Sequence, residues 1–84
     1  MANGSRFVYL LRSTPYPDHY YVGLTSDIAT RLATHNSGGS QHTSALRPWE
    51  LVVSLEFSSE SSAVTFEKYL KSGSGRAFAK RHFV

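Results

Sequence analysis

Two apolar runs near the start of the chain have the character of β-strands. Residues 7–11, Phe-Val-Tyr-Leu-Leu, form an unbroken apolar and aromatic run, which predicts a strand buried on both faces near the centre of a sheet. Residues 13–18 then bring two prolines and several turn-forming residues, and residues 19–24 resume the strand-like pattern. The two runs therefore predict a β-hairpin with a loop of about six residues.

The hydrophobic period changes to that of a helix after the second strand. Thr25 or Ser26 as N-cap, with Asp27 in the first turn, predicts the start of this helix. Its expected buried side consists of Ile28, Ala29, Leu32 and Ala33. Arg31 and His35 are four residues apart and therefore share one face of the helix. Gly38 suits the left-handed position that commonly ends a helix.

A third strand is predicted in the middle of the chain. Residues 37–49 read as a long polar loop, rich in glycine and serine at first. Residues 50–57 then alternate, which places Leu51, Val53 and Leu55 on one face of a strand.

Two further helices complete the pattern. The first is predicted from Ala63 to about Ser72, and Gly73 and Gly75 end it. Its buried stripe consists of Ala63, Phe66 and Leu70. The last helix is predicted over residues 76–82, with Ala77 and Phe78 toward the core. The order β-β-α-β-α-α predicts an α+β fold, a short mixed sheet with helices packed on it.

The length and composition of the chain are typical of one small domain. Its 84 residues make one small domain, which we assign to residues 6–84 after a disordered lead-in at residues 1–5. The absence of cysteine excludes a disulfide scaffold and a thiolate metal site. No apolar run approaches the roughly 20 residues that cross a bilayer, and the N-terminus does not resemble a signal peptide. We therefore expect a cytoplasmic protein without a membrane partner, associated with the nucleoid if it is bacterial.

Charge is distributed unevenly along the chain. Residues 1–67 carry four Lys or Arg against six Asp or Glu, whereas the residues after Glu67 carry no acid. The five cations of this basic block are Lys68, Lys71, Arg76, Lys80 and Arg81. Such a block attracts polyanions, nucleic acid above all, although a solvated face without a partner would have the same charge.

Glu67 is the most informative single position. It falls at the edge of the apolar stripe of its helix, where a carboxylate is costly unless it is paired, protonated or bound to a metal. The alternative to a metal is an ion pair with Arg31 or Lys71.

Tyr9 and Tyr21 lie on adjacent strands of the predicted hairpin. A core tyrosine with its hydroxyl at the rim is the ordinary case, and tyrosine becomes a useful base only when a cation or metal lowers its pKa from about 10. Arg31 would help in this, and its guanidinium also suits bidentate contact with a phosphate. His35, one helical turn further on, is a candidate proton relay or phosphate ligand.

The order and spacing of these segments resemble the GIY-YIG nuclease domain. Phe7-Val8-Tyr9 stands at the first tripeptide of the family name, and Tyr21-Val22-Gly23 stands at the second. Arg31 and His35 follow as in the helix of the family. Pro48 to Val52 resembles its third strand, and Phe66 to Gly73 resembles the segment with its metal-binding glutamate. The resemblance covers residues 6–83 and is closest to the small stand-alone members related to the N-terminal nuclease domain of the bacterial excinuclease.

This resemblance implies a three-stranded antiparallel sheet flanked by helices and a divalent metal cofactor, Mg²⁺ or Mn²⁺. Glu67 would be the metal ligand, and one of Tyr9 and Tyr21 would be the general base. Arg31 would stabilise charge on the phosphate, and His35 would assist in proton transfer or positioning.

The expected function is that of a metal-dependent endonuclease on DNA, branched or damaged, in repair or processing and with little sequence preference. Arg31 and the basic block would contact the phosphates. Two alternatives stay open: a catalytically silent nucleic-acid-binding module, and an RNA-directed or partner-dependent nuclease that needs a second protein, or a second copy of itself, for substrate choice.

Overall fold

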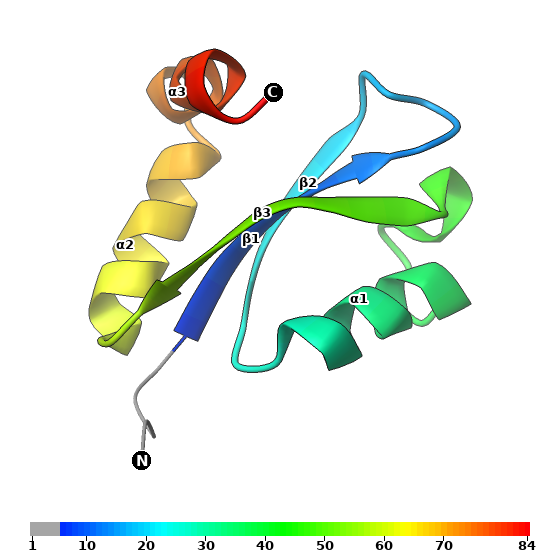
Figure 1. Cartoon of the computed structure of the whole chain (residues 1–84), viewed down its shortest axis with the longest axis horizontal. Helices are drawn as coiled ribbons and strands as arrows, with labels where there is room; N and C mark the ends of the chain where they lie inside the picture. Colours follow the sequence, from blue (N-terminus) through cyan, green and yellow to red (C-terminus); the bar gives the residue numbers. More distant parts are fainter. Residues whose placement is uncertain (1–5) are drawn as a thin grey trace.

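The computed structural model describes residues 6–84 (Figure 1). The expected lead-in at residues 1–5 lies outside the described residues. Three strands and three α-helices alternate along the chain with one short 3₁₀-helix: β1 (Arg6–Ser13), β2 (Tyr20–Thr25), α1 (Ile28–Ser37), η1 (Ser44–Leu46), β3 (Trp49–Phe57), α2 (Glu60–Leu70) and α3 (Gly73–His82). Within residues 6–84 no helix has the length and apolar character that a membrane crossing requires.

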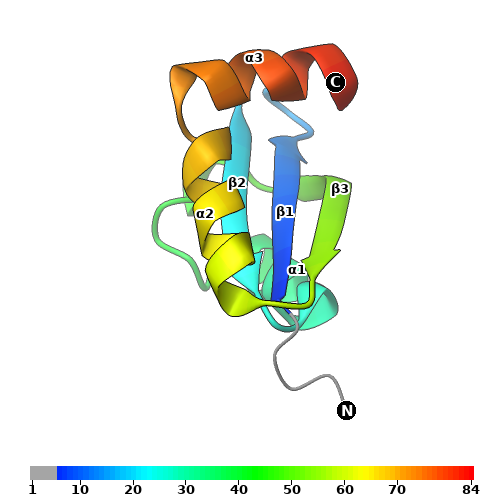
Figure 2. The ribbon, with the colours of Figure 1, turned by 90° about the vertical axis from the view of Figure 1, so that its left-hand side faces the viewer.

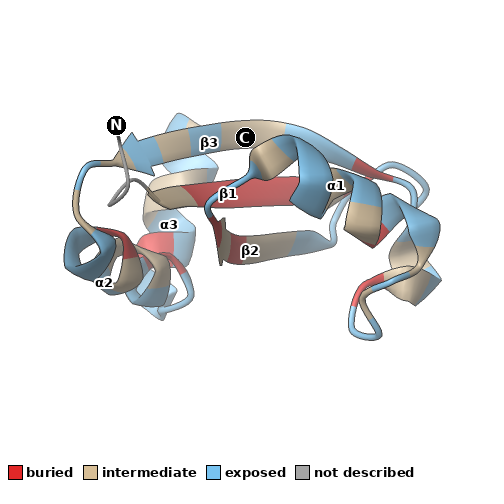
Figure 3. Ribbon diagram, turned by 90° about the horizontal axis from the view of Figure 1, so that it is seen from below, coloured by how far each residue is buried: buried red, intermediate tan, exposed pale blue. Residues whose placement is uncertain are grey.

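The strand order of the sheet is β2-β1-β3, so the unbroken apolar run forms the central strand as predicted. β1 is antiparallel to both neighbours, which confirms the antiparallel sheet implied by the family resemblance and corrects the mixed sheet expected from the pattern alone. Val8, Tyr9, Leu10 and Leu11 are all at most 3% exposed, because both faces of β1 are covered. Figure 3 shows this strand as the most buried part of the sheet.

The helices cover opposite faces of the sheet, α2 and α3 on one side and α1 on the other (Figure 1). Val8 of β1 packs with Ala63 and Leu70 of α2, as the predicted stripe of that helix requires. On the other face, Tyr9 and Leu11 pack with Trp49 and with partly buried residues of α1. Alternate residues of one central strand therefore belong to two separate apolar clusters.

Helix α1 is rotated relative to its predicted orientation. Ala29 and Ala33 are exposed, whereas His35 is 1% exposed and joins Ile28 and Leu32 on the side toward the sheet. The spacing of these three residues, i, i+4 and i+7, is itself a helical stripe. The His35 imidazole, which has two hydrogen bonds, is buried in place of the two alanine methyl groups, because these would bury far less surface.

The ends of α1 agree only in part with prediction. The N-cap is Asp27 and neither Thr25 nor Ser26, since the Asp27 carboxylate accepts hydrogen bonds from the amide and the hydroxyl of Thr30. At the other end Gly38 has φ +86°, which confirms the left-handed position predicted for it.

Helices α2 and α3 both begin earlier than predicted. Ser59 caps α2, so that helix starts at Glu60 and not at Ala63. It ends at Leu70, and the hydroxyl of Ser72 caps α3 by accepting from the amide of Gly75. Of the two residues of α3 expected to face the core, Phe78 packs against it and Ala77 is exposed. Its neighbour Ala79 takes the inner position.

The third strand contains an irregularity that the alternation did not predict. Val53 pairs with Leu10 but Leu51 pairs with Leu11, so two residues of β3 match one step of β1. Leu51 therefore leaves the face shared by Val53 and Leu55 and is 39% exposed.

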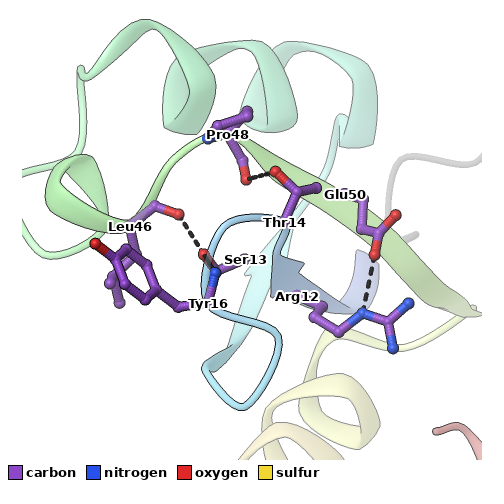
Figure 4. Close-up of polar contacts among 7 residues, drawn as sticks. All are labelled: Arg12, Ser13, Thr14, Tyr16, Leu46, Pro48 and Glu50. Atoms are coloured by element: carbon purple, nitrogen blue, oxygen red, sulfur yellow. Dashed lines mark hydrogen bonds and ion pairs between the residues drawn. The ribbon is translucent and has the colours of Figure 1, made fainter.

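The hairpin is tied to the segment before β3 (Figure 4). The buried Ser13 hydroxyl donates to the carbonyl of Leu46 at 2.6 Å and accepts from the amide of Tyr16 at 3.1 Å. Thr14 donates to the carbonyl of Pro48 at 3.1 Å. The predicted polar loop is therefore ordered in its second half, where Thr43 and Trp49 are also buried.

Candidate active site

Tyr9 lies where the central strand faces Gly23 of the edge strand. The two residues are cross-strand partners. A Cβ atom on residue 23 would overlap the ring and hydroxyl of Tyr9, so this phenol occupies the space that a side chain would need. Gly23, in the second tripeptide of the resemblance, therefore makes room for the tyrosine of the first.

Three aromatic rings gather at this point. The Tyr9 hydroxyl lies 3.0 Å from Nε2 of His35, a buried contact between residues 26 positions apart. The ring centroid of Tyr21 lies 4.9 Å from that of His35 and 6.2 Å from that of Tyr9. The structure thus brings together Tyr9, Tyr21 and His35, as the sequence predicted.

The second nitrogen of His35 bonds to a residue that the sequence analysis missed. Nδ1 lies 2.8 Å from Oγ1 of Thr43, which is 1% exposed. The Thr43 hydroxyl donates to the carbonyl of Ser40 at 3.4 Å, and the Thr43 carbonyl accepts from the Trp49 indole at 2.9 Å. We assign the His35 proton to Nδ1, which would donate to Thr43, since the Thr43 hydroxyl can direct its single proton to Ser40. This leaves Nε2 as an acceptor for the Tyr9 hydroxyl.

Arg31 is exposed on α1 and acts on both buried groups. Burial first and the Arg31 charge second lower the pKa of His35, which keeps the imidazole neutral near pH 7. The charge of Arg31 and its hydrogen bond also lower the pKa of Tyr9, but burial, helped by Tyr21, outweighs them and raises that pKa to about 12. Arg31 therefore acts on the pKa of Tyr9 in the direction expected of it, but burial prevails, and Tyr9 is protonated at neutral pH.

Glu67 approaches the same site from α2. Its negative charge contributes to the raised pKa of Tyr9, which puts the carboxylate within electrostatic reach of the phenol. Its side chain is 17% exposed, and Oε2 lies 2.7 Å from Nζ of Lys71. The ion pair with Lys71 was the alternative to metal binding, and the structure contains this pair.

The donor set fits only one kind of metal. Residues 6–84 contain no group of three or more His, Cys, Asp or Glu side chains able to enclose an ion. A partly exposed single carboxylate suits a hard cation that keeps most of its water ligands, as Mg²⁺ does. A structural zinc site would require more side-chain ligands than this part of the chain offers.

The cations of the basic block are all exposed, but they do not all line the same part of the surface. Lys71, Arg76 and Lys80 line one hollow with Tyr21, whereas Lys68 and Arg81 do not line it. His42, next to Thr43, is exposed.

The chain is similar to known proteins in sequence and in fold. The family model described as "GIY-YIG catalytic domain" matches residues 5–81. The chain is 45% identical over 65 residues to the "Structure-specific endonuclease subunit slx1" of Talaromyces marneffei, covering 70% of this chain and 17% of that protein. The corresponding protein of Debaryomyces hansenii is 41% identical over 71 residues, covering 76% of this chain and 20% of that protein.

Small bacterial proteins are similar as well. A UPF0213 protein of Streptococcus pneumoniae is 43% identical over 53 residues, with 62% of this chain and 54% of that protein covered. The solution NMR structure of a UPF0213 protein from Bacillus halodurans superimposes with a TM-score of 0.55 at 29% identity, covering 92% of this chain and 81% of that one.

The chain spans only about a fifth or less of the fungal relatives and about half of the streptococcal one, so the likeness to these proteins concerns one domain. Within that domain the family model covers nearly every residue, and the family resemblance is confirmed. The chain belongs to the GIY-YIG catalytic domain family.

Proposed function

We propose that this domain is a divalent-metal-dependent endonuclease that hydrolyses phosphodiester bonds of DNA, with Tyr9, Tyr21, Arg31, His35 and Glu67 as its site. The observation that carries the proposal is the buried contact of the Tyr9 hydroxyl with His35 Nε2, within electrostatic reach of the Glu67 carboxylate. The family is one of catalytic nuclease domains, and the fungal relatives are named endonuclease subunits. Both support the same chemistry.

Proton transfer follows from the protonation states. Tyr9 is protonated and donates to a neutral imidazole, because the pKa of Tyr9 is raised to about 12 and that of His35 is lowered. As the Tyr9 oxygen takes a proton from the attacking water, its own proton passes to Nε2 of His35, the hydroxide forms a bond to phosphorus, and the bond from phosphorus to the leaving 3′ oxygen breaks. Tyr9 is therefore the base and His35 the final proton acceptor, while Tyr21 packs against the imidazole and fixes its plane.

Charge stabilisation comes from two sides of the site. The guanidinium of Arg31, on α1, would contact the non-bridging phosphate oxygens as negative charge develops on them. Glu67, on α2, would hold Mg²⁺ or Mn²⁺, which would supply further neutralisation of negative charge, including charge on the leaving 3′ oxygen. Lys71, which pairs with Glu67, would give up that carboxylate and remain beside the phosphate.

The nature of the substrate is part of the proposal. The fungal relatives carry the words "structure-specific" and "subunit" in their names. We extend both to this chain as expectations: DNA with branches or altered strand structure, and a protein partner that selects among substrates.

Cleavage assays with matched variants test the proposal. Plasmid, flap, branched and RNA substrates are incubated with protein in Mg²⁺ or Mn²⁺. Tyr9→Phe and His35→Ala should each lower the rate about 10²- to 10⁴-fold, the usual contribution of a general base. Tyr16→Phe, at an exposed hairpin position, should cleave normally. Nucleic-acid binding without cleavage, unchanged by Glu67→Ala, would instead support a catalytically silent module.

A further inference from the structure

A hollow of about 610 Å³ lies between the β1–β2 hairpin and the C-terminal helices. Figure 2 shows α3 lying across the end of the sheet at which β2 begins. On the strand side the hollow is lined by Tyr20 and Tyr21, and on the helix side by Lys71, Arg76 and Lys80. The opposed walls are thus aromatic and cationic.

The hollow shares two residues with the candidate active site. Tyr21 belongs to both, since its ring centroid lies 4.9 Å from that of His35. Lys71 also belongs to both, since its ammonium lies 2.7 Å from the carboxylate of Glu67. A nucleic acid strand with its phosphate at Arg31 and Glu67 would therefore have its neighbouring nucleotide at the hollow.

The charge of the hollow suits a phosphate backbone. Three cationic side chains line it against one acidic side chain, that of Asp18. The two remaining cations of the basic block, Lys68 and Arg81, do not line it, although both are exposed. The hollow thus collects three cations of one linear block on a single wall.

The floor of the hollow distinguishes unpaired from paired nucleic acid. Leu10, Val22 and Leu70 lie beneath the charged wall. A duplex offers mainly phosphates to such a wall, because its bases are stacked and paired inside, and would leave the apolar floor without a partner. An unpaired base covers apolar surface and stacks on an aromatic ring. A volume in the range of pockets that hold one small ligand accommodates a single nucleotide.

Tyr20 is held in a suitable position for stacking. It is the cross-strand partner of Arg12 on β1, and Arg12 pairs in turn with Glu50 of β3. The Arg12 guanidinium donates to Glu50 at 2.8 Å, and its pKa is raised first by the Glu50 hydrogen bond and then by one to Tyr20. Tyr20 thus lies next to an ion pair that joins β1 and β3, and 42% of the residue is exposed.

We propose that this hollow binds an unpaired DNA nucleotide next to the phosphate that is cleaved, with its base stacked on Tyr20 and its backbone phosphates on Arg76 and Lys80. This inference rests on the proposed nuclease function and gives that site a preference for substrates with single-stranded segments. Tyr20 is a specificity-determining residue in this arrangement and takes no part in proton transfer.

Binding in EDTA tests the hollow separately from catalysis. Anisotropy of a labelled single-stranded DNA oligonucleotide and of its duplex is measured with the full chain and its variants, after thermal melts show that each variant is folded. Tyr20→Leu, which keeps apolar volume but loses the ring, should weaken single-strand binding roughly ten-fold and duplex binding less than about two-fold. Tyr20→Phe should bind as the unaltered protein does.

Matched charge variants test the second half of the proposal. Arg76→Ala and Lys80→Ala should each weaken single-strand binding and reduce its salt dependence by about 0.7 in the log–log slope. Lys68→Ala and Arg81→Ala, which remove the same charge outside the hollow, should have the smaller effect on affinity.

Two results would overturn the inference while leaving the nuclease proposal standing. One is Tyr20→Leu binding single strands as tightly as Tyr20→Phe, and the other is equal losses for cations inside and outside the hollow. Cleavage in Mn²⁺ is measured on the same proteins. If the unaltered protein binds single strands through Tyr20 but cuts no substrate, the nuclease proposal fails, and with it the assignment of the hollow to a cleaved phosphate.

Discussion

Replacing Thr43 by valine isolates the contact that orients the imidazole. Valine keeps the branched shape of threonine but has no hydroxyl, so Nδ1 of His35 loses the acceptor that lies 2.8 Å away. Both residues are 1% exposed, and water cannot replace the lost partner. A buried polar atom left without a hydrogen-bond partner, donor or acceptor, costs about 1–3 kcal/mol.

The size of the effect on stability can be worked from this penalty. For a domain of this length, each kcal/mol shifts the melting temperature by about 4–8 °C. A mid-range penalty of about 2 kcal/mol therefore lowers the melting temperature of Thr43→Val by roughly 8–16 °C. Thr43→Ser keeps the hydroxyl and loses one methyl group, which costs about 0.8 kcal/mol by area and hence roughly 3–6 °C. Thermal melts of the three proteins measure both changes.

Nitrogen-15 NMR of His35 separates an orienting role from a merely structural one. Without Thr43 Oγ1 as acceptor, the proton favours Nε2, where it can be donated to the Tyr9 oxygen, and Nε2 then cannot receive the Tyr9 proton. Thr43→Val should therefore shift His35 toward the Nε2–H tautomer and reduce cleavage strongly, whereas Thr43→Ser should keep both the tautomer and the rate. If Thr43→Val has the same melting temperature and the same His35 spectrum as the unaltered protein, the assigned hydrogen-bond chain is wrong.

Three further predictions concern the same group of residues. Gly23→Ala should cost about 1–3 kcal/mol and abolish cleavage by displacing the Tyr9 ring, whereas Gly73→Ala, which meets no atom within 4 Å, should be neutral in guanidinium melts. Burial lowers the pKa of His35, so the imidazole binds a proton at a higher pH in the unfolded state than in the folded state. Stability should therefore fall as the pH drops below about 6.5. This fall should be absent in His35→Gln and kept in His42→Gln when melting temperature is measured against pH. Ultraviolet titration should show one tyrosine ionising at about 12 and missing in Tyr9→Phe, with stability lost as the pH rises from 10 toward 12.

The strands and the C-terminal end of α1 could be predicted because their signals are local. An unbroken apolar run needs cover on both faces, which is what the central position of β1 provides. Gly38 follows a helical stripe and adopts the left-handed conformation that glycine allows. Neither inference depends on which distant segment supplies the packing partner.

Thr43 could not be predicted, because its burial is decided by two other segments. It lies in a polar, glycine- and serine-rich stretch without hydrophobic period, and only the approach of α1 and Trp49 encloses it. The tryptophan at the end of that stretch was the one available signal, since a buried indole requires an acceptor for its N–H. The same physical cause explains the error at Ala29 and Ala33. A helical wheel ranks alanine above histidine in hydrophobicity and ignores the hydrogen bonds that His35 makes to other segments.

The position of the site at the edge of the sheet explains why distant residues converge on it. Tyr9 and His35 lie on the α1 side of the sheet, and Glu67 comes from α2 on the opposite side. Because β2 is an edge strand and Gly23 has no side chain, the Tyr9 ring lies over that strand, where the charge of Glu67 reaches it. The glycine of the second tripeptide therefore makes room for the Tyr9 ring, and the proposed site can draw on residues of both helical layers.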